Sequence, residues 1–323
     1  MRGVLETAGE VVQLDLPSSW AQRAVRGLEP SLATAGTAGP SVVVRTGAGL
    51  VPWSGGGRRL GRGVVVDRGA VAFRSACSSG ADVAVSASGE VVQVVADWRA
   101  GPREAGLHGL LPRRARLLAA DVLLHYPVLW RAGWRSRVPL HAAALVVRDR
   151  GVLVVGASGV GKTTLARAEV AEGGALVSDN LVVADGENVW GVLEPIRAEG
   201  GDGPRTTHGR RLTTMASRRL NTRVDLVVVL RRDGGPAGSR PLAASAAARE
   251  LVASTYCAGE LRRYWGFAAA LSAGTGRGPV HPAVGPVAEQ LCAGATCLEL
   301  DLGDRPAAHL SDVIDTLEVL PWT

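Results

Sequence analysis

Short apolar runs separated by glycine and serine form the pattern of the first 100 residues. Alternation of apolar with small or polar residues is typical of half-buried strands. Strands are predicted at residues 11–16, 41–45, 63–67, 71–74, 82–86 and 90–98. The last two flank the stretch SASG and are expected to form a hairpin. We interpret residues 1–105 as a β-rich N-terminal module.

The pattern changes to helical spacing after Gly101 and Pro102. Residues 110–134 carry apolar side chains three and four positions apart, which predicts a helix. Pro127 is expected to interrupt it, because proline has no N–H to donate. We interpret residues 106–138 as a helical connector.

From residue 139 onward, strand and helix patterns are mixed. Two apolar runs, 140–147 and 151–155, are joined by the tight turn RDRG and predict an antiparallel hairpin. Further strands are predicted at residues 175–178, 181–183, 189–193, 225–230 and 297–300, helices at 163–171, 243–264 and 307–319, and a mobile loop at 199–207. Residues 139–323 are therefore expected to form an α/β domain.

Composition narrows the class of protein. A formal charge of +6 favours acidic ligands, but the arginines occur in scattered pairs and aromatic residues make up only 4% of the chain, so no nucleic-acid surface is expected. No apolar window approaches the roughly 18 residues of a membrane span, and the N-terminus lacks a signal-peptide pattern. The four cysteines have no metal-ligand spacing, which is typical of free thiols in a reducing compartment. These features predict a soluble cytoplasmic protein without a membrane partner.

One lysine, Lys162, stands among the 36 basic residues of the chain, and every other one is arginine. This composition indicates that arginine has replaced lysine at every position where the two are interchangeable. Lysine is therefore expected to remain only where a compact ammonium is needed. Gly156, Gly161 and Thr163 surround it in the spacing GxxxxGK(S/T) of a P-loop. In that motif, backbone N–H groups cradle phosphate, the lysine reaches the β and γ oxygens, and the hydroxyl binds magnesium.

The context of the motif fits this interpretation. An apolar strand at residues 152–155 precedes it, and a helix whose N-terminus faces the anion follows it. The alternative is a glycine turn that only joins strand to helix. ATP and Mg²⁺ are the expected cofactors. The predicted nucleotide-binding residues are Gly156, Ala157, Ser158, Gly159, Val160, Gly161, Lys162, Thr163 and Thr164.

A phosphoryl-transfer site also needs groups that hold the metal and orient the acceptor. Asp179 ends an apolar strand and is the main candidate for either task, although an Asp-Asn turn between strands is the alternative. His141 is a candidate neighbour of the phosphates or a packed strand residue. Glu194 and Arg197, in the stretch LEPIR, are candidates for the metal and phosphate shell or form an exposed charge pair. The candidate metal ligands are Thr163, Asp179 and Glu194.

The stretches LHAAALVVRDRGVLVVGASGVGKTTLARA and LVSDNLVV resemble the catalytic domain of the bacterial HPr kinase/phosphorylase family over residues 139–200. They are similar also to HPr-kinase-like enzymes of peptide natural-product pathways. The resemblance implies a phosphoenolpyruvate-carboxykinase-like P-loop fold and phosphorylation of a serine hydroxyl on a protein or peptide. It further implies that the P-loop residues bind ATP and magnesium, that Asp179 is the acid or base, and that His141 lies beside the phosphates.

The chain departs from the family at several positions. Asn180 stands where the family has a second acidic residue, which removes one carboxylate from the metal site. The stretch LEPIR matches the family's Leu-Glu-Ile-Arg-Gly signature only loosely. The region that the family uses for dephosphorylation has no counterpart here, so phosphorolysis is not expected.

Three functions follow from these features. The first is an ATP-dependent kinase acting on a serine or threonine hydroxyl of a protein or peptide, with natural-product precursor peptides among the acceptors. The second is a small-molecule kinase on the same scaffold. The third is a non-catalytic nucleotide-gated binding module, in which Asn180 marks lost catalysis. An edge strand of the β-rich module could pair with an extended peptide, which favours the first. The sequence leaves a homo-oligomer open.

Overall fold

The structure is a computed structural model that describes residues 1–25, 39–51, 53, 56–194, 196–198, 203, 205, 211–213, 217–234, 237–303 and 310. The described residues form two compact units. The first takes its residues from 1–136 and 260–282, and the second from 137–205, 210–259 and 283–310. The loop expected at 199–207 and the helix expected at 307–319 fall largely outside the described residues.

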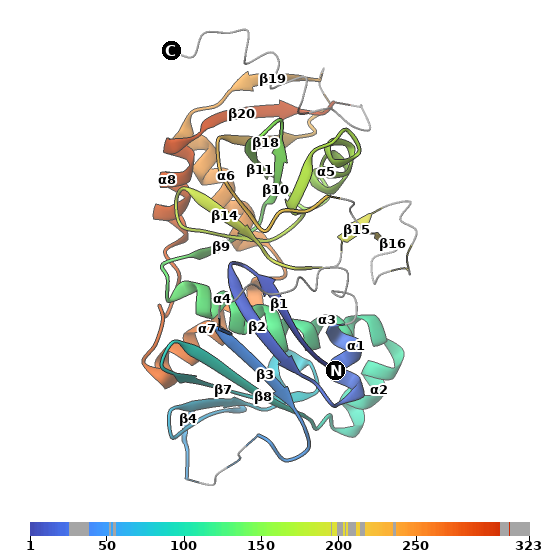
Figure 1. Cartoon of the computed structure of the whole chain (residues 1–323), viewed down its shortest axis with the longest axis vertical. Helices are drawn as coiled ribbons and strands as arrows, with labels where there is room; N and C mark the ends of the chain where they lie inside the picture. The colour runs from blue at the N-terminus through green and yellow to red at the C-terminus, as the bar shows by residue number, and fades with distance from the viewer. Residues whose placement is uncertain are drawn as a thin grey trace. The chain divides into compact units, whose positions relative to one another are not determined.

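A long mixed sheet dominates the described part of the first unit (Figure 1). Its strands lie in the order β1 (Arg2–Thr7), β2 (Glu10–Asp15), β3 (Val42–Thr46), β8 (Val91–Trp98), β7 (Ala81–Ser88), β6 (Ala70–Phe73), β5 (Val64–Asp67) and β4 (Arg58–Gly61). Strand β3 runs parallel to β2 and to β8, and the other neighbours are antiparallel. The sequence patterns did not predict β1 or β4.

The hairpin expected from the stretch SASG is confirmed. Strands β7 and β8 pair from Ala81↔Trp98 to Ser88↔Val91, so the serines belong to the strand and only Gly89 and Glu90 make the turn. Gly89 has a φ of 56°, which a two-residue hairpin turn requires and glycine adopts without strain.

Helices complete the first unit. They are α1 (Ser19–Val25), α2 (Pro102–Leu110), α3 (Pro112–Ala120), α4 (Tyr126–Gly133) and α7 (Arg262–Thr275). Pro127 does not end the helix, contrary to the expectation, because a π-helical stretch at Asp121–His125 joins α3 to α4. There the Tyr126 N–H donates to the Asp121 carbonyl, and this wider turn accommodates the proline ring.

A second mixed sheet forms the centre of the described part of the second unit. Its strands lie in the order β12 (Ala175–Ser178), β10 (Ala143–Val147), β11 (Arg150–Val155), β18 (Leu226–Arg231), β20 (Thr296–Asp301) and β19 (Gly238–Pro241). Strand β18 runs parallel to β11 and to β20, whereas the other pairs are antiparallel. The predicted hairpin into the P-loop is confirmed as β10 and β11, which pair from Ala143↔Val154 to Val147↔Arg150.

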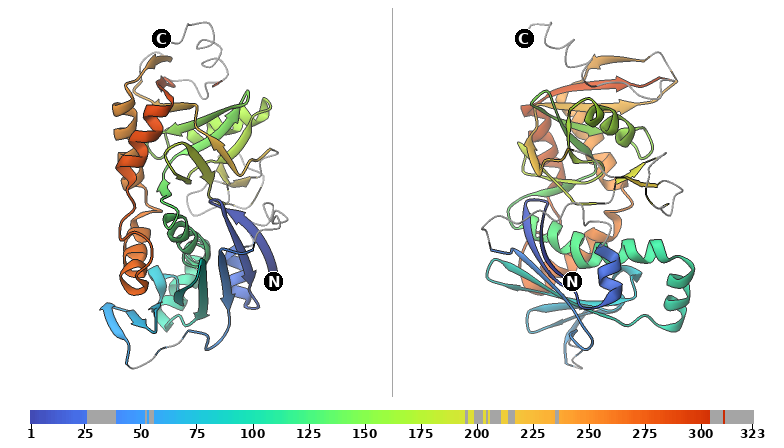
Figure 2. Two further views of the ribbon diagram at one scale, coloured as in Figure 1. Left: turned by 60° about the vertical axis from the view of Figure 1, so that its left-hand side comes forward. Right: turned by 45° about the vertical axis from the view of Figure 1, so that its right-hand side comes forward.

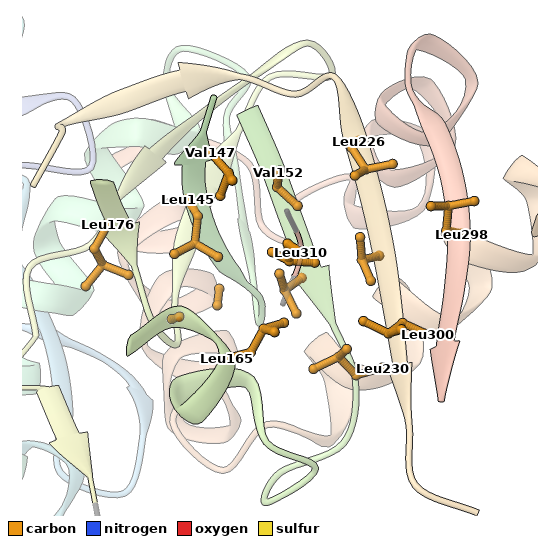
Figure 3. Packing of buried hydrophobic residues seen from close by; sticks show 14 of the residues in the cluster. Leu145, Val147, Val152, Leu165, Leu176, Leu226, Leu230, Leu298, Leu300 and Leu310 are labelled. Carbon is orange, nitrogen blue, oxygen red and sulfur yellow. The ribbon is translucent and has the colours of Figure 1, made fainter. Parts of the chain in front are cut away.

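Helices cover both faces of this sheet. Figures 1 and 2 show α5 (Lys162–Ala171) on one face, with α6 (Ala244–Cys257) and α8 (Val284–Gly294) on the other. Beneath α5, alternate residues of β10, β11, β18 and β20 form a buried apolar cluster with Leu165 and Leu310 (Figure 3). The single helix expected at 243–264 is in fact two, because Ala258 is extended and Gly259 follows it between α6 and α7.

Smaller sheets complete the second unit. One has the strand order β17 (Asn221–Arg223), β14 (Asn188–Gly191), β13 (Val182–Ala184) and β9 (Val138–Leu140), and another pairs β15 (Ile196–Ala198) with β16 (Arg211–Thr213). The strand expected at 140–147 is therefore divided between two sheets, at His141 and Ala142. No helix in the described part of the chain is long and apolar enough to cross a bilayer.

Candidate functional site

The P-loop lies between the end of β11 and the start of α5 (Figure 3). Gly156, Gly159 and Gly161 have φ values of 153°, 86° and 124°, a region that favours glycine. A Cβ on Gly156 would lie 3.0 Å from the carbonyl oxygen of Leu230, so the first glycine is also needed for close packing against β18. Residues 157–159 form an exposed tip. The loop thus has the open backbone geometry that a phosphate cradle needs.

Lys162 begins α5 and is buried, with only 7% of its surface exposed. Its ammonium donates to the carbonyl oxygens of Gly156 at 2.7 Å and Ala157 at 3.2 Å. It also lies 3.3 Å from Nε2 of His141. The ammonium donates to this ring nitrogen in the tautomer that leaves a lone pair on Nε2. The structure thereby brings together two residues that the sequence proposed for the phosphates.

Helix α6 fixes the position of His141. The His141 N–H donates to Oγ1 of Thr255 at 3.1 Å, and its carbonyl accepts from the Ser254 hydroxyl at 3.3 Å. These bonds replace the sheet partners that a continuous strand would have supplied, which explains why the strand divides here. Because β10 is antiparallel to β11, its first residues lie beside the end of β11, at the same edge as the P-loop.

A hydroxyl and a carboxylate meet beside the lysine. Oγ1 of Thr163 lies 3.5 Å from Oδ2 of Asp179, which directly follows β12 and is 8% exposed. The Ser178 hydroxyl stabilises the turn by donating to the Leu181 carbonyl at 2.8 Å. Hydroxyl and carboxylate oxygens are hard ligands of the kind that magnesium prefers. The pair therefore fits a magnesium ion, and Thr163 and Asp179 would hold it.

Glu194 is brought to the same turn by Asn180. The Asn180 amide donates to Oε2 of Glu194 at 2.9 Å, and Glu194 is 6% exposed. In the described part of the chain, no three His, Cys, Asp or Glu side chains gather as a metal centre. A magnesium ion here would thus take most of its ligands from phosphate and water, as is usual for this ion. For Arg197, the structure describes only the backbone, in β15.

Arg218, the first of two consecutive arginines, lies near Asp179, and the sequence patterns did not single it out. Its backbone lies beside β12, where the Arg219 N–H donates to the Leu176 carbonyl at 2.9 Å. The residue as a whole is exposed, but burial around the guanidinium lowers the pKa of Arg218, and the nearby Asp179 carboxylate acts in the opposite direction. An arginine stays charged through such a shift, so Arg218 places a permanent positive charge near Asp179. Its proximity to Asp179 arises from the pairing of its segment with β12. Apart from the two consecutive arginines themselves, nothing in the sequence indicates this proximity.

Comparisons with known proteins give little beyond this geometry. No protein-family model matches the chain, and no curated protein matches it. Among solved structures, it is similar to the HPr(Ser) kinase/phosphatase from Coxiella burnetii, with 12% identity and a TM-score of 0.27 over 56% of this chain and 93% of that chain. A TM-score this low does not show that the two proteins share a fold. The chemistry of this site is therefore argued from its own residues.

Proposed function

We propose that the second unit is an ATP-dependent kinase that transfers the γ-phosphoryl group to a serine or threonine hydroxyl of a protein or peptide. One observation carries the proposal: the chain's single lysine is buried in a glycine cradle, next to a histidine and a hydroxyl–carboxylate pair. Each of these groups has a task in phosphoryl transfer, and they come from three separate segments of the second unit: the P-loop, the residues between β9 and β10, and the turn after β12. A turn that only joined strand to helix would not need them together.

The roles follow from the chemistry of the groups. ATP is the substrate whose γ-phosphorus breaks its bond to the β–γ bridging oxygen and forms a bond to the acceptor oxygen. Lys162 exchanges its carbonyl partners for phosphate oxygens and neutralises the charge that develops on them. Asp179 orients the acceptor hydroxyl and receives its proton. Magnesium, held by Thr163 and Asp179, would supply charge neutralisation when bound.

His141 and Glu194 support these groups. His141 lies 3.3 Å from the Lys162 ammonium and so limits where the ammonium can lie. Glu194 is proposed as a further oxygen ligand on the metal side, directly or through water, and its carboxylate is oriented by Asn180. The phosphoenolpyruvate-carboxykinase-like form of the P-loop fold is part of this proposal, supported by the hairpin of β10 and β11 that runs into the loop.

A peptide acceptor is favoured over a metabolite by the first unit. Its sheet ends in the edge strands β1 and β4, and an exposed edge can bind an extended peptide through main-chain hydrogen bonds. A natural-product precursor peptide belongs to this acceptor class. Asn180 favours one other function, a nucleotide-gated binding module without transfer, because a second carboxylate is absent from the turn.

One experiment separates these functions. The full chain is incubated with γ-labelled ATP, magnesium, a panel of serine- and threonine-containing peptides and a panel of hydroxylated metabolites. Label on a peptide hydroxyl supports the proposal, whereas label confined to metabolites identifies a small-molecule kinase. ATP binding without any transfer supports the binding module. Absence of ATP binding in the wild-type chain would overturn all three.

A further inference from the structure

The P-loop has a second flank, on the side away from Asp179. Strand β18 runs parallel to β11 with Val155 opposite Val229, and β20 runs parallel to β18 with Arg231 opposite Asp301. The C-terminal ends of parallel strands share one edge of a sheet, so the segments that follow β18 and β20 emerge beside the P-loop. The Leu302 N–H, which donates to the Arg231 carbonyl at 3.1 Å, continues this pairing past the strand ends.

Arg232 is the first residue after β18, and its guanidinium lies between the end of β20 and the start of α5. Nη1 donates to the Gly303 carbonyl at 3.2 Å. Nη2 lies 3.8 Å from the position that a Cβ on Gly161 would occupy. Gly303 is itself oriented, because its N–H donates to Oδ1 of Asp301 at 2.8 Å. One edge of the planar guanidinium is therefore fixed on β20, while the other lies at the start of the helix where P-loop amides converge.

The order of the strands separates the two ends of a bound triphosphate. Asp179 follows β12 and His141 precedes β10, and both strands lie on one side of β11. Strands β18 and β20 lie on the other side. For a triphosphate whose γ end lies with Lys162 and Asp179, we expect the α end on the side of the loop that faces β18. Arg232 is the cation that the described structure places at that end.

We propose that Arg232 binds the α-phosphate of a nucleoside triphosphate and thereby selects a nucleotide over inorganic pyrophosphate as the phosphoryl donor. This inference rests on the proposed function. Pyrophosphate can occupy only the β and γ positions, where Lys162 and the glycine cradle bind phosphate. It has no group that reaches the α position. The guanidinium is a planar fork of the kind that binds phosphate oxygens, and its Nη2 end is the one that lies nearest the start of α5.

A purely structural role for Arg232 makes a different prediction. If its only task is to join the ends of β18 and β20 through Gly303, its loss would change stability and would affect all ligands of the P-loop equally. A loss that affects ATP and ADP but not pyrophosphate requires contact with a group that pyrophosphate lacks. The ligand series, rather than the size of any single loss, therefore decides between the two roles.

The test measures binding of ATP, ADP and pyrophosphate by calorimetry, with magnesium, to the full chain and to Arg232→Ala, Arg232→Lys and Arg249→Ala. Arg249 is an exposed residue of α6, on the opposite face of the sheet from α5, and its substitution removes the same charge. Loss of a charge-assisted bond predicts that Arg232→Ala weakens ATP and ADP roughly 10- to 100-fold and leaves pyrophosphate within about 2-fold. Arg232→Lys keeps the charge but not the fork, so its ATP affinity should be intermediate.

Several outcomes would overturn the inference. Unchanged ATP affinity in Arg232→Ala, or an equal loss for ATP and pyrophosphate, excludes recognition of the α-phosphate. The same loss in Arg249→Ala would identify a long-range charge effect. If the wild-type chain takes up ATP but no pyrophosphate, ATP loss in Arg232→Ala with partial recovery in Arg232→Lys supports the assignment. Failure of the wild-type chain to bind any of the three ligands would instead contradict the proposed function itself.

Discussion

The two units bury charged side chains in different ways. In the first unit, buried charges bond to neighbouring parts of the same fold. Arg131, 2% exposed, donates to the carbonyl and the carboxylate of Glu90. Asp121 lies 3.0 Å from Nδ1 of His125, one helical turn away. Such contacts offset the cost of removing a charge from water, and they are spread over the unit.

In the second unit, three of the buried charges gather at one edge of the sheet, whereas Glu169, in the last turn of α5, accepts from the Leu310 N–H. Lys162, Asp179 and Glu194 are each less than 9% exposed, and all lie on or beside the loops that follow β11, β12 and β14. Lys162 contacts main-chain carbonyls and the His141 imidazole, which are partners that phosphate oxygens can replace. Burial alone therefore does not distinguish a charge that stabilises the fold from one that can bind a ligand. The location of the charge at the P-loop edge of the sheet, with partners that a ligand can replace, makes the distinction.

The largest effect is expected from removal of the lysine. Lys162→Ala should lower the transfer rate by roughly 10³-fold or more and should weaken ATP binding, because the phosphate charge loses its main protein counter-charge. The variant also loses bonds to the carbonyls of buried Gly156 and exposed Ala157, so its thermal unfolding is measured beside that of the wild-type chain. A radiolabel transfer assay and calorimetry measure the two effects.

Lys162→Arg is the matched control for charge. The guanidinium is wider and cannot lie as a point charge between phosphate oxygens, so this variant should also be inactive. Activity close to that of the wild-type chain in Lys162→Arg would show that charge alone is required. The explanation for the chain's single lysine would then fail.

Asp179→Asn should separate binding from chemistry. The amide keeps the shape of the side chain but cannot accept a proton as a carboxylate does, so transfer at saturating ATP should fall roughly 10²- to 10³-fold. ATP affinity should stay within a few-fold of the wild-type value. Asp149→Asn is the control, since Asp149 is an exposed turn residue with a φ of 61°, a conformation that asparagine tolerates. Equal transfer rates in the two variants would remove Asp179 from the reaction.

The parts of this site that could be predicted from sequence are the local ones. The hairpin of β10 and β11 follows from apolar runs around a tight turn, and the P-loop follows from the spacing of its glycines and lysine. The pattern along the chain leaves His141 open between a neighbour of the phosphates and a packed strand residue, because its position depends on Thr255, which is 114 residues away. Arg232 lies beside the P-loop, and Arg218 beside β12, only through the pairing of segments that are far apart in the sequence. A pattern along the chain contains no direct information about which strands will pair.

A smaller effect is expected at Asn180. Asn180→Asp replaces the donor to Glu194 with a second carboxylate, so repulsion should displace Glu194 and lower transfer roughly 10-fold. The double variant Asn180→Asp with Glu194→Gln exchanges the two groups and should recover part of the loss, which a double-mutant cycle measures. An increase in transfer in Asn180→Asp would instead mean that Asn180 marks a lost carboxylate, and would favour the binding module for the natural chain.

The smallest effect on the site is expected from the first unit. Asp121→Ala removes the partner of the buried His125 and should lower the free energy of unfolding by about 1–3 kcal/mol, because a buried ring nitrogen loses its bond. Asp121→Asn, which keeps an acceptor oxygen, should lose less. Denaturant unfolding followed by tryptophan fluorescence measures both variants, and ATP affinity and transfer should stay within about 2-fold. A large loss of ATP affinity in a folded Asp121→Ala chain would mean that the buried charges of the first unit also serve the nucleotide, and the contrast between the two units would not hold.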